Sequence, residues 1–463
     1  MMNWWLFKEQ KKPERSEFPV LATVIIALFV LIISVAVRAV TWPGDKHVDE
    51  YFFTQSVVFP LLVLLCVVFL FLIPVSTRKH YEETRVAIAK EREEQLKQYA
   101  RRHLIIAGWA TLTPLDEPAL NMLKLEGEFP LAPKTPIKIP REYDFEFTQT
   151  ELLLNRLLAP LAEKLKTPHY RNFDSTLWVR GGDESCCDDL RRTFERLGLA
   201  SNEIEYLQDC PDYSLVTNWI DSSTNYVTNR LLVIVDMHDE GSESKSMENA
   251  SAFWLTNIYG KTEGEKPMYL YRPITDVTDV ETVIPVYLYI APVISPKTLW
   301  YTALSKVEKY PLMQILDDRK LVANRLDVET SFGGKTAGYR WLVLALAADA
   351  VKYSQGDQLV AASDNNKLGL AAVSSRLTTA PSSSWYVDYM YPWQYGGLFG
   401  MFLSGSLFVG ICGFGKPEAM ANVSGWSVLF WALFPLTLFL SMGIMATWHA
   451  GNEAYRDMWG LDE

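Results

Sequence analysis

The chain has 463 residues, of which 49% are hydrophobic and 21% charged, and its formal net charge at pH 7 is -11. This composition excludes an intrinsically disordered chain, a collagen and a small disulfide-stapled domain. The acidic excess argues against a nucleic-acid partner, because phosphate binding needs a concentrated basic face. The cysteines are odd in number and two lie in apolar runs, which predicts a reducing compartment: Cys66, Cys186, Cys187, Cys210 and Cys412.

Two pairs of apolar segments predict two membrane hairpins, because each segment has about the 20 residues that cross a bilayer as a helix. Glycine is frequent in the third segment, which is also typical of a flexible loop. The aromatic residues at its start (Tyr391, Trp393 and Tyr395) are instead typical of a membrane interface. The hairpins are 18–76, with spans at about 18–40 and 51–76, and 389–448, with spans at about 391–415 and 425–448.

Basic residues next to the spans predict the orientation of the hairpins. They are frequent in segments 1–17 and 77–103, whereas the loops inside the hairpins hold only Lys46 and Lys416. The positive-inside rule therefore predicts a multi-pass protein of a bacterial inner membrane, with both termini and the main domain in the cytoplasm. A cleaved signal peptide at the first span is rejected, because no small-residue cleavage site follows and a second span comes at once.

The segment 77–103 is charged and free of glycine and proline, so we expect a helix that continues the second span. Its basic residues either touch anionic lipid headgroups or are simply solvated. The tail, 449–463, is expected to be cytoplasmic.

The middle of the chain, 104–388, has the pattern of a soluble α/β domain. A strand, an acidic turn and a second strand occur once in each half, beginning at Leu231 and at Gln358, which predicts a duplicated core. The expected strands are 104–108, 176–179, 231–235, 251–256, 283–293, 359–362 and 368–373, and the expected helices are 190–199, 212–220, 298–308 and 337–351.

Three segments of this domain resemble the thiolase-like superfamily, and within it the β-ketoacyl synthases. Residues 104–114 (LIIAGWATLTP) are similar to the opening strand and turn, and 210–235 has the spacing from the nucleophilic cysteine to the next core strand. Residues 334–338 (GKTAG) resemble the Gly-His-Thr region. The resemblance implies a thiolase-like duplicated α/β core, flanked here by two all-α transmembrane hairpins, and a homodimer formed through a shared sheet.

In that family a cysteine thiolate holds an acyl group and two histidines handle decarboxylation. The resemblance places Cys210 at the nucleophile, just before the helix expected at 212–220, whose N-terminus would lower the thiol pKa, although Asp212 would raise it. Lys335 occupies the place of the second histidine, and lysine is no neutral imidazole donor. None of the six histidines falls in the matching segment: His47, His80, His103, His169, His238 and His449.

Other polar groups point to no metal or cofactor. Cys186 and Cys187 are adjacent, which is poor spacing for tetrahedral zinc. Residues 333–336 end in Gly-Lys-Thr but lack the first glycine of a phosphate loop. A third group, Asp236, His238 and Asp239, follows a core strand, where ligand sites occur in open α/β sheets, but a polar turn explains it equally well.

These features predict a membrane-anchored thiolase-like pseudoenzyme that binds a protein partner, for example an adaptor or immunity protein of a bacterial toxin-delivery system. The lipid bilayer is the other expected partner. One alternative is a membrane-bound acyl-transfer or condensing enzyme with Cys210 as nucleophile. Another is a non-catalytic acyl-chain binder. A transporter is not expected, because the spans contain almost no ionisable residues.

Overall fold

The computed structural model divides the chain into two compact units. An α/β unit comprises Met1–Trp5 and Glu93–Pro381, and a helical unit comprises Leu6–Arg92 and Ser382–Glu463. The residues that the structure describes are 3–8, 20–44, 46–135, 137–167, 172–223, 227–238, 245–258, 266–290, 293, 295–378, 391–414 and 425–460.

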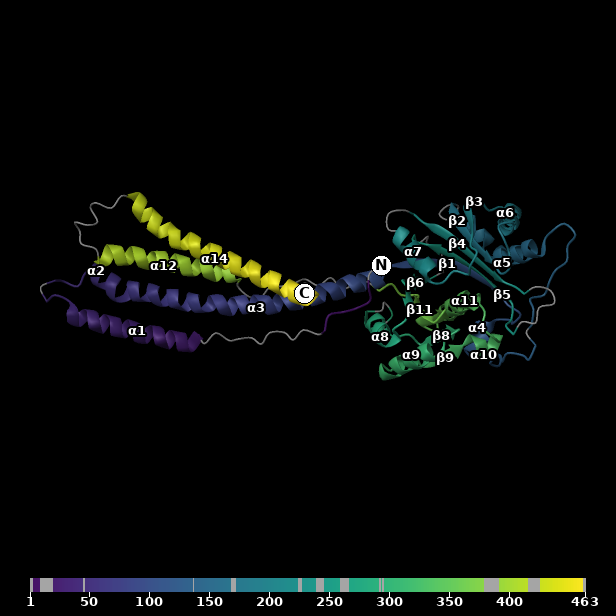
Figure 1. The fold of residues 1–463 in the computed structure, drawn as a ribbon, viewed down its shortest axis with the longest axis horizontal. Helices are drawn as coiled ribbons and strands as arrows, with labels where there is room; N and C mark the ends of the chain where they lie inside the picture. The colour runs from purple at the N-terminus through teal and green to yellow at the C-terminus, as the bar shows by residue number, and fades with distance from the viewer. Residues whose placement is uncertain are drawn as a thin grey trace. The chain divides into compact units, whose positions relative to one another are not determined.

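The α/β unit is built on one mixed sheet (Figure 1). Its strands are β1 (His103–Leu112), β2 (Phe173–Val179), β3 (Ser201–Tyr206), β4 (Asn229–Asp236), β5 (Asn249–Thr256), β6 (Tyr269–Tyr271), β7 (Ile274–Val277), β8 (Thr298–Thr302), β9 (Asn324–Asp327), β10 (Gln358–Asp364) and β11 (Lys367–Ser374). Its helices are α4 (Pro118–Met122), α5 (Gln149–Leu165), α6 (Cys186–Leu197), α7 (Ser214–Ser222), α8 (Val280–Ile290), α9 (Lys306–Asp318), α10 (Val328–Phe332) and α11 (Tyr339–Lys352).

The strand order shows that this unit is duplicated, as the two similar strand pairs predicted. The first half runs β3-β2-β4-β5-β1, and the second runs β9-β8-β10-β11-β6 in the mirrored order. In each half the parallel strands are followed by one antiparallel strand, β5 or β11. Antiparallel pairing of β1 with β6 joins the halves. By their places in the two halves, α7 and α11 are therefore equivalent helices.

Three apolar cores separate the layers. One lies between the two half-sheets and contains α7 and α11, whose residues from Tyr339 to Ala348 are nearly all buried. A second packs α5 and α6 against the outer face of the first half-sheet. A third packs α8 and α9 against the second half-sheet. Helices buried on every side, such as α11, read as apolar all round, which is why its sequence lacks an amphipathic pattern.

The expected strand at 283–293 is wrong, because residues 283–290 belong to α8 (Val280–Ile290) and Val293 is in neither a helix nor a strand. The segment is rich in β-branched residues, which favour strands by propensity. Asp279 nevertheless caps the helix by accepting a hydrogen bond from the backbone N–H of Thr282 (3.1 Å). The buried Ile284 and Tyr287 follow helical spacing, so packing overrides propensity. Residues 291 and 292 lie outside the described part.

The expected helix at 298–308 is also wrong. Thr298–Thr302 forms β8, whose residues are all buried. The helix α9 begins only at Lys306, where Ser305 and Glu308 form a capping box. The aromatic residues of β8 are typical of a strand buried on both faces. The capping box determines where α9 begins.

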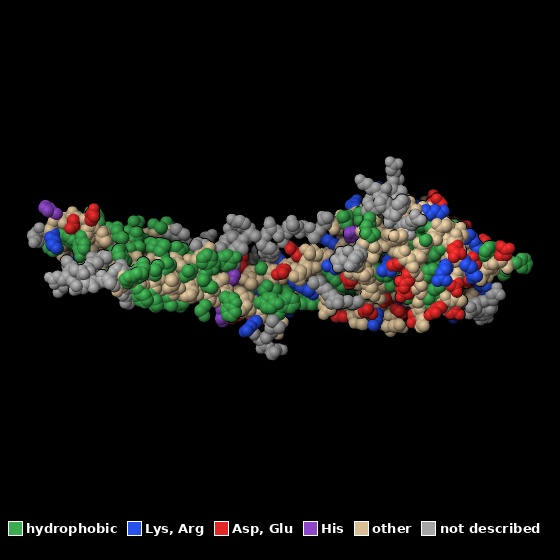
Figure 2. All heavy atoms as spheres, turned by 90° about the horizontal axis from the view of Figure 1, so that it is seen from above, with side chains coloured by type: hydrophobic (Ala, Val, Ile, Leu, Met, Phe, Trp, Pro, Cys, Tyr) green, Lys and Arg blue, Asp and Glu red, His purple; other side chains and the backbone are tan. Residues whose placement is uncertain are grey.

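Among its described residues, the helical unit has four helices long and apolar enough to cross a membrane, at the four places where the sequence predicts spans. They are α1 (Val20–Thr41), a continuous helix made of α2 (Glu50–Phe53), the π-helical turn η1 (Thr54–Val58) and α3 (Phe59–Ala100), then α12 (Pro392–Phe414) and α14 (Gly425–Trp459). Figure 2 shows hydrophobic side chains over much of this unit's visible surface, whereas charged side chains are frequent on the α/β unit. The long α3 includes the charged segment 77–100, as expected.

Glycines bring α12 and α14 into close contact. A Cβ built on Gly400 would lie 2.8 Å from Leu436 Cα, and one on Gly443 would lie 2.7 Å from Trp393 Cα. Small residues allow such backbone approach between membrane helices, where no hydrophobic effect drives association. Gly396 and Gly400, two of the glycines that also suggested a loop, are therefore packing residues against α14.

We predict that Gly400→Ala destabilises the helical unit by about 1–3 kcal/mol, because the new methyl group would push against the α14 backbone. Gly405→Ala is the matched control, since its Cβ would meet only Leu62 side-chain atoms at 3.8 Å. Denaturation in mild detergent, followed by circular dichroism, measures both. Equal loss of helix stability in the two variants would contradict the packing role of Gly400.

Candidate functional site

The segments that precede α7 and α11 meet within the α/β unit. The Cys210 thiol, before α7, lies 3.5 Å from the carbonyl oxygen of Ala337, before α11. Tyr213 donates a hydrogen bond from its hydroxyl to the Arg340 carbonyl (2.8 Å), and Trp341 Nε1 donates to the Pro211 carbonyl (2.9 Å). The structure thus brings Cys210 and the 334–338 segment together.

The buried carboxylate of Asp236, at the end of β4, holds the 334–338 segment in place. Its Oδ2 accepts hydrogen bonds from the Gly338 N–H (2.8 Å) and the Thr336 hydroxyl. Its Oδ1 lies 2.6 Å from Nε of Arg180, which also donates to the Thr336 hydroxyl. A Cβ at position 338 would come within 2.5 Å of Asp236 Oδ2, so only glycine fits there.

A second ion pair, between the buried Arg340 and the exposed Asp364, also lies near Cys210. Arg340 Nη1 donates to the Cys210 carbonyl oxygen (3.3 Å), and Nη2 lies 3.2 Å from Asp364 Oδ2 at the end of β10. The two arginines and two aspartates around Cys210 balance in charge. The junction therefore offers no net positive potential to an anionic substrate.

Burial governs the chemistry of Cys210. Desolvation of the thiol raises its pKa to about 12, the nearby Arg340 lowers it, and Asp236 and Asp364 raise it further. Because a thiol reacts as its thiolate, Cys210 is a poor nucleophile at neutral pH. The position just before α7 does not offset the cost of burying the charge.

No histidine of the described residues hydrogen-bonds to Cys210, whose thiol contacts main-chain carbonyl oxygens. Lys335 extends to the carbonyl oxygen of Ala303 (3.2 Å), at the end of β8. His238, after β4, binds the Ser246 carbonyl through Nε2 (2.9 Å). Among the described residues, no histidine therefore lies beside the Cys210 thiol as a general base. His169 lies outside the described residues.

The cavity beside this junction is small and polar. It has a volume of about 150 Å³, and its lining includes Asp212, Asp276, Arg340, Asp364 and Lys367. Lys367 and Asp276 form an ion pair at 3.1 Å. Such a space suits a few water molecules, which occupy about 30 Å³ each in the liquid, and not an acyl chain.

The other polar groups noted in the sequence form no second site among the described residues. Cys186 and Cys187 begin α6, and burial is the largest cause of their raised pKa values. Within the described residues, no three His, Cys, Asp or Glu side chains are arranged to hold a metal ion. Asp236 contacts the 334–338 segment rather than His238, and Asp239 lies outside the described part.

Sequence reasoning missed Arg180, Thr336 and Arg340. One signal was present for Arg340, an isolated charge in the first turn of an otherwise apolar helix, because such a charge needs a buried partner. Arg180 directly precedes Gly181 and Gly182, and nothing in its local sequence indicates that it would meet Asp236.

No family model matches the chain, and no curated protein matches it. Solved structures similar to it include a type II polyketide acyl-carrier protein in complex with its ketosynthase bound to the hexaketide (9% identity, 59% of this chain and 99% of that chain, TM-score 0.41). Another is the ishigamide ketosynthase/chain length factor (12% identity, 59% of this chain and 99% of that chain, TM-score 0.38). A third is 3-oxoacyl-(acyl carrier protein) synthase III from Pseudomonas aeruginosa (14% identity, 59% of this chain and 98% of that chain, TM-score 0.36). These are structures of the type that the sequence resemblance names. At such identities and TM-scores, neither family membership nor activity follows.

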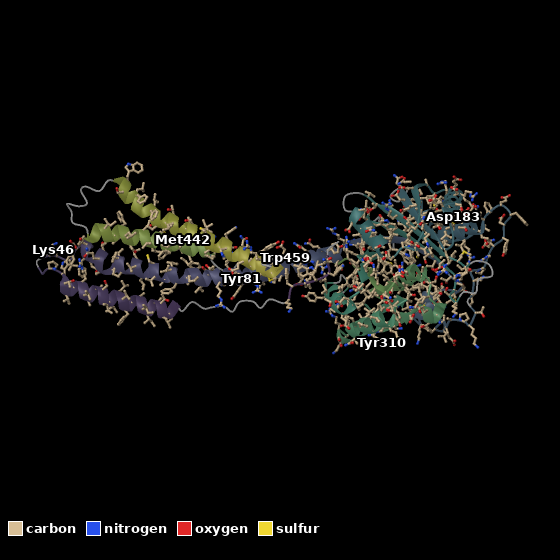
Figure 3. The ribbon with its side chains drawn as sticks, viewed as in Figure 1. Lys46, Tyr81, Asp183, Tyr310, Met442 and Trp459 are labelled. Atoms are coloured by element: carbon tan, nitrogen blue, oxygen red, sulfur yellow. The ribbon has the colours of Figure 1, made fainter. Side chains whose placement is uncertain are left out.

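We predict that Asp236→Ala destabilises the α/β unit by about 3–5 kcal/mol, because it leaves Arg180 without its partner and frees the 334–338 segment. Asp183→Ala is the control, since this exposed carboxylate, labelled in Figure 3, caps only the local turn at Ser185. Urea unfolding in mild detergent, followed by tryptophan fluorescence, compares them. A loss below 1 kcal/mol for Asp236→Ala would contradict its role in the junction.

Proposed function

We propose that this chain is a membrane-anchored, non-catalytic protein whose thiolase-like α/β unit binds a protein partner. One observation carries the proposal: Cys210, which the resemblance places at a ketosynthase nucleophile, has a partly buried thiol that lies against the Ala337 carbonyl oxygen, and its pKa is raised to about 12. The duplicated strand order supports the thiolase-like core. An adaptor or immunity protein of a bacterial toxin-delivery system is one concrete form of this role.

The two alternative functions, a condensing or acyl-transfer enzyme and an acyl-chain binder, have less support. A condensing or acyl-transfer enzyme would need a thiolate and a base near it, and the junction supplies a protonated thiol held against Ala337. An acyl-chain binder would need an apolar tunnel, whereas the cavity beside Cys210 is small and polar.

Exposed aromatic side chains support a protein-binding role. Tyr143 and Phe145 are 80% and 109% exposed, on a segment that also carries Asp144 and Glu146. Aromatic residues anchor many protein interfaces, so a basic partner surface with an apolar recess fits this segment. A homodimer is part of the proposal, with β3 and β9, the first and last strands of the strand order, as strands open to further pairing.

We also propose that α1, α3, α12 and α14 cross a bacterial inner membrane, with both termini and the α/β unit in the cytoplasm. The lengths and apolar surfaces of the helices support membrane insertion. The basic residues of segments 1–17 and 77–103 support the orientation. Lys416 lies outside the described residues.

The test of the non-catalytic role is the alkylation rate of Cys210. With a pKa near 12 instead of 9, its thiolate population is lower by about a thousandfold, since each pKa unit is a tenfold change. We expect iodoacetamide at pH 8 to label Cys210 at least a hundredfold more slowly in the native protein than in urea. Intact-mass spectrometry measures the extent of alkylation over time, and peptide mass spectrometry identifies the alkylated cysteine.

A ketosynthase-directed electrophile is the second arm of this test, with Cys210→Ala as the matched variant. Slow labelling spread over several cysteines agrees with the proposal. Rapid stoichiometric labelling that disappears in Cys210→Ala would restore the enzyme and sink the non-catalytic assignment.

The orientation is tested with single cysteines in a chain whose native cysteines are replaced. We expect a membrane-impermeant maleimide, added to whole cells, to label Lys46→Cys, in the first hairpin loop, and to leave Arg319→Cys unlabelled. Lysis should make Arg319→Cys reactive. Labelling of Arg319→Cys in intact cells would reverse the proposed topology.

A further inference from the structure

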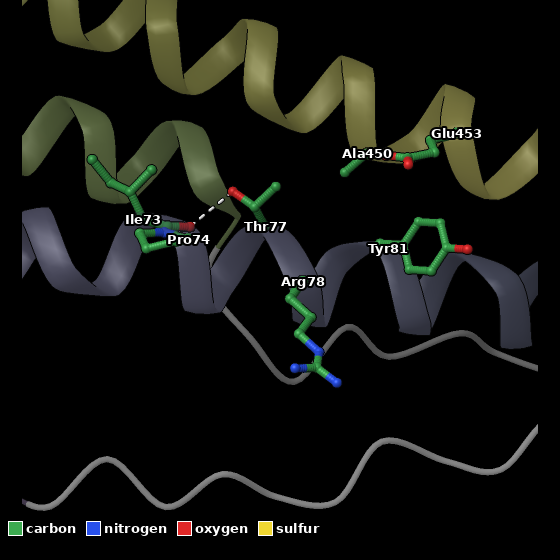
Figure 4. A pocket seen from close by; sticks show the side chains of 7 residues that line it. All are labelled: Ile73, Pro74, Thr77, Arg78, Tyr81, Ala450 and Glu453. Atoms are coloured by element: carbon green, nitrogen blue, oxygen red, sulfur yellow. Dashed lines mark hydrogen bonds between the residues drawn. The ribbon is translucent and has the colours of Figure 1, made fainter.

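Exposed apolar surface has a different meaning in each of the two units. Within the helical unit, a largely apolar groove of about 500 Å³ runs between α3 and α14 (Figure 4), and the side chain of Arg78 extends away from α14. If these helices cross a membrane, as proposed above, acyl chains cover such a surface. On the α/β unit, a group of exposed apolar side chains has no lipid to cover it and marks a candidate interface.

One such group lies on the connection between α4 and α5. The described residues of 123–148 form no helix or strand. Connections of this length without secondary structure are uncommon in compact domains and are often functional. The exposed Tyr143 (80%) and Phe145 (109%) belong to its last part, residues 142–147 (EYDFEF), where acidic and aromatic residues alternate. We call these six residues the acidic arch.

Contacts on both sides hold the acidic arch in place. Just before it, Arg141 Nη2 lies 3.5 Å from Oε1 of Glu248, whose carboxylate is fully buried. Just after it, Gln149 Nε2, at the start of α5, donates a hydrogen bond to the Glu142 carbonyl oxygen (2.7 Å). A loop that is already ordered loses less conformational entropy when it binds a partner.

Three carboxylates belong to the acidic arch, which contains no lysine or arginine. Asp144 Oδ1 accepts a hydrogen bond from the Glu146 backbone N–H (2.9 Å), which closes a turn. Among the described residues, the one ion-pair contact of the three carboxylates joins Glu142 to Arg156 at 3.9 Å. Asp144 and Glu146 therefore remain available to a cation from outside the chain.

The third aromatic residue, Phe147, shows which cation suits this sequence. Cζ of Arg196, on α6, lies 3.6 Å from the centroid of the Phe147 ring, and Nη2 donates to Glu151 Oε1 (2.5 Å). One guanidinium thus stacks on a ring and pairs with a carboxylate, which planar arginine does better than lysine. Within the described chain, no cation lies over Tyr143 or Phe145, although acidic residues flank both.

We propose that the acidic arch binds an arginine-containing segment of a partner protein. Guanidinium groups of that segment stack on Tyr143 and Phe145 and pair with the neighbouring carboxylates, as Arg196 does at Phe147. The inference rests on the proposed protein-binding function and names the chemistry of the partner. A second copy of this chain, whose net charge is -11, and an anionic lipid surface are disfavoured by charge.

The experiment uses the full chain in nanodiscs of phosphatidylcholine, which has no net charge, and a phage-displayed library of random peptides as the probe. We expect arginine to be at least roughly twofold more frequent in the retained peptides than in the unselected library. Tyr143→Ala/Phe145→Ala should abolish this enrichment, because the double variant removes the rings on which guanidinium groups stack. Both side chains are exposed, so folding should be unaffected.

Tyr310→Ala is the matched control, since Tyr310 on α9, labelled in Figure 3, is 68% exposed. The double variant and this control keep the net charge, so attraction of arginine to the acidic chain as a whole is equal in all three proteins. Equal arginine frequencies in the peptides retained by the wild type and the double variant, or loss of the enrichment in Tyr310→Ala as well, would overturn the proposal.

The carboxylates are tested with the most enriched peptide, synthesised with a fluorescent label and titrated by anisotropy at low salt. Glu146→Gln should weaken its binding by roughly two- to fivefold, as expected for an exposed ion pair. Replacing arginine by lysine in the peptide should weaken binding by at least roughly threefold. Affinity unchanged by both substitutions would contradict guanidinium recognition.

Failure of this proposal and failure of the proposed function give different results. If Cys210 is alkylated slowly and the retained peptides do not depend on Tyr143 and Phe145, only the acidic arch loses its role. Rapid labelling of Cys210 removes the non-catalytic function, whatever peptides the chain retains.

Discussion

The carboxylate of Asp236 joins parts of the chain that lie about a hundred residues apart. It is buried at the end of β4 and accepts hydrogen bonds from Thr336 and Gly338, which precede α11. Arg180, at the end of β2, balances its charge. A buried charge is tolerated only when it is paired and hydrogen-bonded, so all of these groups must be in place together. The meeting of the two equivalent helices, and hence the surroundings of Cys210, depend on this arrangement.

That arrangement also explains the chemistry of the cysteine. The Ala337 carbonyl is held against the thiol because its neighbour Gly338 is bonded to Asp236. A main-chain carbonyl accepts a hydrogen bond from a thiol but cannot stabilise a thiolate, and burial adds to the cost of the charge. Cys210 thus lies where the two halves of the duplicated fold meet.

The helical unit follows a different physical rule. Its helices keep apolar side chains on the outside, and α12 and α14 are held by backbone contact at Gly400 and Gly443. The helix α3 is shared by both units: its last part packs in the α/β unit, where Leu96 and Ala100 are fully buried. One continuous helix thus belongs in part to the helical unit and in part to the α/β unit.

The sequence by itself determined the four apolar helices, the charged continuation of α3 and the duplicated core, because these depend on local composition and on repeated patterns. It misplaced α8 and the boundary between β8 and α9, where burial and capping overrode propensity. It singled out Cys210 and Lys335 but could not give their environments. Only the tertiary structure decided that Arg180 and Arg340 surround the thiol while Lys335 turns to Ala303. Electrostatic energies depend on distances and burial between segments far apart in the chain, and no local pattern contains them.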